Sequence, residues 1–199
     1  MEKPHVTFHI NKKLEKKMIN YFLKNDEKGG FNFAKTILED HPDLLKIKDD
    51  HNKVDQYVDN YYNENQKILI KSKQKFQDKW SEKEDTFLQL TNSLFKTNSW
   101  PEGNYKGYVS IVQCGPRFLE TCEFQTYFGW DNNFISQVAH EMLHFKFFDT
   151  VKRLGLNPKD EKIWLLSEIT NDIIQSESDF VKLQGYKPSI SYPEYKNTF

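Results

Sequence analysis

The chain has 199 residues with a net charge of −1, and 37% of them are hydrophobic, 29% charged and 15% aromatic. This length can bury a sizeable core as one domain, and the aromatic content excludes a disordered chain. The near-neutral charge predicts no binding to nucleic acid or to an anionic membrane. The sequence contains no run of 18 apolar residues, so no transmembrane helix is predicted.

The ends and the cysteines bear on the cellular compartment. No apolar leader is present at the N-terminus, so a cytoplasmic protein is expected if the chain starts at its natural end, and a secreted one if a signal peptide was removed. Two cysteines, Cys114 and Cys122, are too few for a disulfide framework. They flank a predicted turn at Gly115-Pro116, so a disulfide bond between them is possible but is not implied by the sequence.

The N-terminal half is predicted to be one strand followed by helices. In residues 4–10, apolar side chains alternate with His5, Thr7 and His9, which predicts a short strand with both histidines on its outer face. Residues 49–65 are polar and rich in tyrosine. Apolar residues at helical spacing predict helices over residues 12–23, 32–39 and, as one long region, about 66–96.

The pattern changes period after Pro101 and Gly103. Residues 108–112 and 118–128 are rich in β-branched and aromatic side chains and partly alternate, and a turn at 114–117 joins them. This pattern predicts an antiparallel hairpin. Together with residues 4–10, the strands (about 107–113 and 118–128) would form a small antiparallel sheet.

The most informative motif is His140-Glu141-Met142-Leu143-His144, an H-E-x-x-H pattern within a helix predicted over about 132–154. Positions i and i+4 lie on one helical face, so the two imidazoles can bind one Zn²⁺. Glu141 would lie beside them as a base for a water on the metal. The alternative is an amphipathic helix with two surface histidines.

A second apolar helix, predicted over about 158–183, carries Glu168 and Asp172 on one face. A catalytic zinc site with two histidines needs a third protein ligand and leaves a position for water. Glu168 can be that ligand, and Asp172, one turn on, can accept the Nδ1–H of a ligand histidine. Asp149, five residues after His144, is a weaker candidate for the third ligand.

H-E-x-x-H followed by a helical E-x-x-x-D resembles the gluzincins, the thermolysin-like branch of the zincin metallopeptidases. The resemblance covers about residues 105–180 and implies zinc bound by His140, His144 and Glu168, Glu141 as general base, and Asp172 as a partner of His140. It also implies that one strand of the hairpin binds extended substrate. Gluzincins add a residue that stabilises the developing oxyanion. The candidates for that role are Tyr186, Tyr192, Tyr195 and Arg153.

We therefore expect a single α+β, zincin-like domain over residues 1–199, with a small antiparallel sheet and a mainly helical remainder. Residues 1–100 would form a mostly helical part with the first strand, residues 105–184 the hairpin, active-site helix and glutamate helix, and 185–199 a tail. The expected function is a zinc-dependent peptidase acting on a peptide or protein. Alternatives are a non-catalytic binding or regulatory protein whose metal site is closed by a fourth ligand (Glu161, Asp149 or a tail residue), and a narrow-specificity effector protease.

Overall fold

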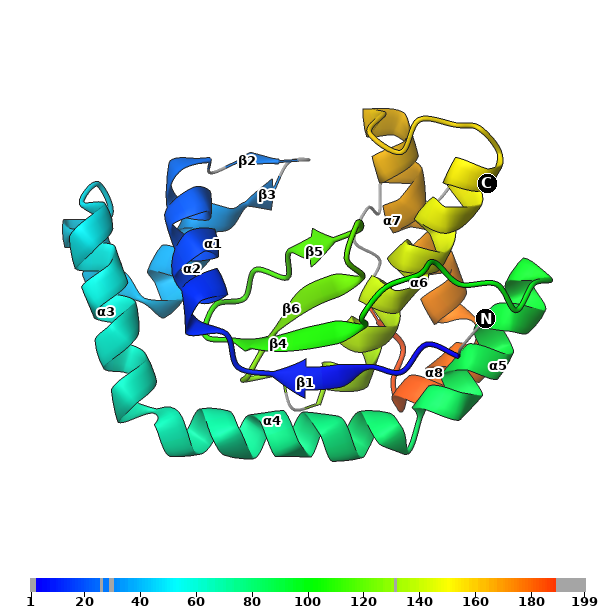
Figure 1. Ribbon diagram of the computed structural model, residues 1–199, viewed down its shortest axis with the longest axis horizontal. Helices are drawn as coiled ribbons and strands as arrows, with labels where there is room; N and C mark the ends of the chain where they lie inside the picture. Colours follow the sequence, from blue (N-terminus) through cyan, green and yellow to red (C-terminus); the bar gives the residue numbers. More distant parts are fainter. Residues whose placement is uncertain (1–2, 26, 29–30, 131, 189–199) are drawn as a thin grey trace.

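The computed structural model describes residues 3–25, 27–28, 31–130 and 132–188. These residues form an α+β fold in which helices surround a small mixed sheet (Figure 1). The order of strands across the sheet is β1 (Thr7–His9), β4 (Lys106–Ser110), β6 (Glu123–Tyr127) and β5 (Arg117–Phe118). A separate pair is formed by β2 (Glu27–Lys28) and β3 (Phe31–Asn32).

The predicted antiparallel sheet is wrong, because β1 and β6 both run parallel to β4. Only β5 is antiparallel to β6, so the hairpin turns at residues 119–122 rather than at 114–117. The segment between β4 and β6 is long enough to return the chain to the start of the sheet, and β5 forms part of that return. β4 and β6 are each buried at three or four consecutive residues, as expected of parallel strands covered on both faces.

The strand near the N-terminus has the predicted orientation. Val6 and Phe8 are buried, whereas His5 and His9 are exposed. His5 Nδ1 lies 2.7 Å from an oxygen of Glu84. Cys114 and Cys122 are both buried and free, so the structure contains no bridge between them.

The N-terminal helices agree with the sequence in part. α1 (Lys12–Lys24) and α2 (Phe33–Asp40) form as predicted, and a 3-10 turn η1 (Pro42–Lys46) follows. The tyrosine-rich stretch is a helix, α3 (His51–Glu64), because Val54, Val58 and Tyr62 form a buried stripe. The long helix predicted over 66–96 is two, α4 (Gln66–Ser81) and α5 (Glu84–Phe95).

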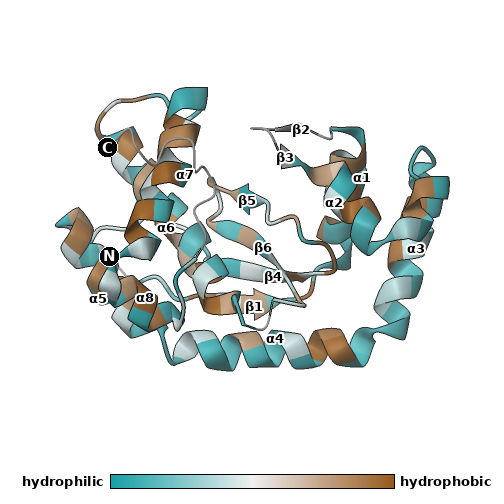
Figure 2. Ribbon diagram, turned by 180° about the vertical axis from the view of Figure 1, so that it is seen from behind, coloured by the Kyte–Doolittle hydropathy of each residue, from teal (hydrophilic) through white to brown (hydrophobic). Residues whose placement is uncertain are grey.

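Helix α4 connects the two sides of the molecule. It runs beneath β1, with α1, α2 and α3 at one end and α5, α6, α7 and α8 at the other (Figure 1). Hydrophilic and hydrophobic residues are mixed along α4 (Figure 2), and its buried residues are Leu69, Phe76 and Trp80. The ring of Phe76 stacks on Phe134 at a centroid distance of 3.9 Å, so α4 also packs against α6.

The C-terminal helices are α6 (Phe134–Arg153), α7 (Glu161–Ser176) and α8 (Ser178–Gln184). The helix predicted over about 132–154 is confirmed as α6, whereas the predicted helix 158–183 is interrupted at Glu177, whose backbone is extended. α6 is buried on almost all sides between the sheet and its neighbouring helices. No helix within the described ranges combines the length and apolar character that a membrane span requires.

Candidate metal centre

Helix α6 presents two imidazoles to one point. His140 and His144 are one turn apart, and their Nε2 atoms lie 2.9 Å from each other. The side chain of His140 is 19% exposed and that of His144 is 0% exposed. The alternative of two surface histidines on an amphipathic helix is therefore wrong.

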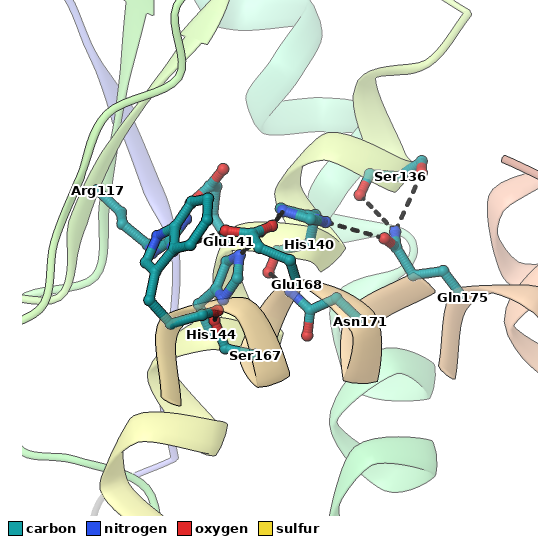
Figure 3. Close-up of polar contacts among 10 residues, drawn as sticks. Arg117, Ser136, His140, Glu141, His144, Ser167, Glu168, Asn171 and Gln175 are labelled. Carbon is teal, nitrogen blue, oxygen red and sulfur yellow. Dashed lines mark hydrogen bonds and ion pairs between the residues drawn. The ribbon is translucent and has the colours of Figure 1, made fainter. Parts of the chain in front are cut away.

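Helix α7 packs against α6 and adds a carboxylate to this pair (Figure 3). Oε2 of Glu168 lies 3.2 Å from Nε2 of His140 and 3.4 Å from Nε2 of His144. Zinc bonds to such atoms of about 2.0–2.1 Å in a tetrahedron imply ligand–ligand distances of about 3.3 Å. The three atoms are thus spaced much like one face of a zinc coordination tetrahedron, and the donor set suits zinc.

Gln175 fixes the orientation of His140. Its Nε2 donates to Gln184 Oε1 at 2.7 Å. The same nitrogen donates to Ser136 O at 2.8 Å, which leaves Oε1 facing His140 Nδ1 at 3.1 Å (Figure 3). An amide oxygen can only accept, so Nδ1 carries a proton, and in the neutral imidazole the lone pair that a metal needs is therefore on Nε2. The group at Nδ1 is therefore Gln175 and not Asp172, which is half-buried on the same helix.

Glu141 points into the same region from α6. It is buried, and its Oε2 has no hydrogen-bond partner among the described residues. A Cβ placed on Gly115 would lie 3.6 Å from Glu141 Oε1, so the turn between β4 and β5 passes close to this carboxylate. The carboxylate of Glu141 is therefore buried near the cluster, where it interacts electrostatically with His140 and Glu168.

Arg117 on β5 is the site residue that the sequence did not identify. Its Nη2 lies 2.9 Å from Glu168 Oε1, and its Nη1 lies 4.0 Å from Glu141 Oε2. The only hint in the sequence is that the chain has two arginines, of which this one is the last residue of the predicted turn at 114–117. Its contact with Glu168 depends on how β5 meets α7, which no local pattern reveals.

Of the four predicted oxyanion-stabilising residues, the two within the described ranges, Arg153 and Tyr186, do not contact the cluster in any described interaction. Arg153 is nine residues beyond His144, about 13 Å along the helix, and it pairs with Asp149 at 3.0 Å. Tyr186 is half-buried after α8, and the described contacts of the cluster do not include it. Tyr192 and Tyr195 lie outside the described residues.

The environment sets the charges of these groups in the absence of a metal. Burial raises the pKa of Glu141, although His140 and Arg117 act against it. Burial would also raise the pKa of Glu168, but His144, His140 and Arg117 outweigh it and bring that pKa well below its usual range. Burial lowers the pKa of His144 strongly, whereas the neighbouring carboxylates overcome burial and raise the pKa of His140. An ionised Glu168 and a neutral His144 are the forms that a metal ion requires.

Within the described part of the chain, the group of side chains that could hold a metal ion consists of His140, His144 and Glu168. The two named candidates for a further ligand lie elsewhere, because Asp149 pairs with Arg153 and Glu161 is exposed at the start of α7. Three ligands with a base beside them are typical of a catalytic zinc site, and four ligands of a structural one.

The chain was also compared with known proteins. No protein-family model matches it, and neither the curated proteins nor the solved structures gave a significant match. The evidence on the function of the site is therefore its own geometry and chemistry.

Proposed function

We propose that the chain is a zinc-dependent metallopeptidase of the gluzincin type, with His140, His144 and Glu168 as the metal ligands. The convergence of their three donor atoms, at distances of 2.9 to 3.4 Å, carries this proposal. The two histidines come from α6 and Glu168 from α7. The hydrogen bond from His140 to Gln175 holds one imidazole in the tautomer that a metal needs.

Glu141 is the general base of the proposed reaction. Bound zinc supplies an acidified water and a polarised substrate carbonyl. Glu141 takes the proton from the attacking water and passes it to the leaving amine, which needs a carboxylate whose pKa is closer to neutrality than that of a solvated glutamate. Burial of Glu141 raises its pKa in that direction.

The substrate class is an extended peptide. β5 is at the edge of the sheet, and its Arg117 contacts Glu168, so a peptide paired with the free side of β5 would pass beside the cluster. Main-chain hydrogen bonds to an edge strand bind peptides with little dependence on sequence.

Metal analysis tests this proposal. Purified wild type should contain about one zinc per chain, and both His140→Ala and Glu168→Ala should lose it, because two ligands do not suffice for a stable site. Glu141→Gln should keep the zinc and lose cleavage of a peptide library, since the amide cannot accept the proton. A wild type that takes up no zinc would refute the proposal. Loaded protein that cleaves no peptide while Glu141→Gln binds zinc equally well would favour the regulatory alternative.

A further inference from the structure

The two oxygens of Glu168 have different partners. Oε2 faces the Nε2 atoms of both histidines, at 3.2 and 3.4 Å, whereas Oε1 accepts a hydrogen bond from Arg117 Nη2 at 2.9 Å (Figure 3). A carboxylate can bind a metal through one oxygen or through both. Here the second oxygen is already bound by a charged donor, and such bonds are among the strongest in proteins.

Arg117 is held firmly in this position. Its side chain is 15% exposed, and β5 anchors its backbone by pairing Arg117 with Phe124 on β6. Its guanidinium lies over the ring of Phe148 at 5.9 Å, which adds a contact from α6. The guanidinium therefore joins the sheet to both helices of the metal centre.

The same guanidinium also faces the proposed base. Nη1 of Arg117 lies 4.0 Å from Glu141 Oε2, which is too long for a hydrogen bond but close enough for strong attraction between buried charges. This attraction opposes any movement of Glu141 toward a metal ion held by its neighbours His140 and His144.

We propose that Arg117 is a positioning residue that restricts Glu168 to a single metal-facing oxygen and keeps Glu141 from becoming a ligand. This inference rests on the proposed function. Its consequence is that the protein supplies three ligand atoms and leaves the remaining coordination to water and substrate. Without Arg117, the buried Oε1 would lose its partner, and an unpaired charged oxygen in this environment would turn to the metal instead.

A positive charge alone does not suffice for this role. The fork of a guanidinium can bind Glu168 with one nitrogen while the other faces Glu141, whereas a lysine ammonium is a single point charge on a flexible chain. Arg117→Lys therefore separates the geometry of the side chain from its charge. A purely neutralising arginine would be replaced by lysine without consequence.

The test compares crystal structures of the zinc-loaded wild type, Arg117→Met and Arg117→Lys, with Arg153→Met as a matched control on α6. We expect one Glu168 oxygen within about 2.2 Å of zinc in the wild type and in the control. In both Arg117 variants we expect a second carboxylate oxygen on the metal, from Glu168 or from Glu141. A single bound carboxylate oxygen in all four proteins would overturn the inference. A single bound oxygen in Arg117→Lys together with two in Arg117→Met would also overturn it.

Azide binding to the cobalt-loaded proteins gives a second readout in solution. Azide needs a free coordination position, so its affinity should fall by about tenfold or more in both Arg117 variants and stay unchanged in Arg153→Met. Equal azide affinity in wild type and Arg117→Lys would contradict the inference even if Arg117→Met does not fold. A wild type that binds neither zinc nor cobalt would instead show that the proposed function has failed.

Discussion

Replacing Gln175 by methionine should weaken zinc binding about 10- to 100-fold, which is about 1.4 to 2.7 kcal/mol. Methionine has a similar length but no hydrogen-bonding amide. The change removes the acceptor at His140 Nδ1, so the imidazole is no longer fixed in one tautomer. It also removes the donor that binds Ser136 O at 2.8 Å and Gln184 Oε1 at 2.7 Å. Loss of these buried bonds should lower the stability of the metal-free protein by about 3 kcal/mol.

The zinc affinity can be measured by competition with a chromogenic chelator, and the stability by urea unfolding in the presence of EDTA. Asp172→Asn, on the same helix, is the matched control. Loss of the partner of a ligand histidine lowers metal affinity at least tenfold, and that partner is Gln175. Asp172→Asn should therefore change zinc affinity less than about threefold. If Asp172→Asn lost zinc and Gln175→Met kept it, the assignment of Gln175 as the partner of His140 would be refuted.

Three further predictions concern stability. Burial raises the pKa of Glu15 from 4.5 to about 7, so stability should fall by about 3 kcal/mol as pH rises from 4 to 8, and Glu15→Gln should remove this dependence in urea unfolding. Lys146→Met should cost about 3 kcal/mol by the same measurement, because the buried ammonium donates to the carbonyls of Thr97 at 2.8 Å and Ser99 at 2.5 Å. Glu141→Gln should stabilise the metal-free protein by about 1 kcal/mol in EDTA, since burial disfavours that charge; a loss of stability in this variant would contradict the argument.

The parts of the site that depend on one helix could be predicted from the sequence. The positions of His140, Glu141 and His144 relative to one another follow from helix geometry and need only that the segment be helical, which its apolar spacing indicates. Glu168 required one further step, namely that two helices joined by a short loop pack side by side. That step is also local, because few residues separate α6 from α7.

The choice between Asp172 and Gln175 could not be made from the sequence. Both positions lie within about 40° of Glu168 around the axis of α7, on opposite sides of it. The deciding fact is that α7 buries the side that carries Asn171, Ile174 and Gln175, so this is the side that meets α6. No pattern within α7 shows where α6 lies.

The relative direction of the strands and the position of Arg117 in the site depend on contacts between distant segments. Alternation of residues predicts strands but does not distinguish parallel from antiparallel pairing, and the pairing of β1 with β4 joins residues about a hundred positions apart. Arg117 reaches Glu168 across 51 positions of the chain. Its role becomes visible only when the edge strand and the glutamate helix are placed together.

The burial of charge at this centre is itself an argument for function. A core position filled by two carboxylates, two imidazoles and a guanidinium is less favourable than one filled by apolar side chains of similar volume. A network that served only stability would be expected to satisfy each of its oxygens. Among the described residues, Glu168 is bound on both oxygens, whereas Oε2 of Glu141 has no hydrogen bond. The oxygen left without a hydrogen bond belongs to the carboxylate that the proposed reaction needs for moving a proton, and this distribution is expected of a catalytic centre.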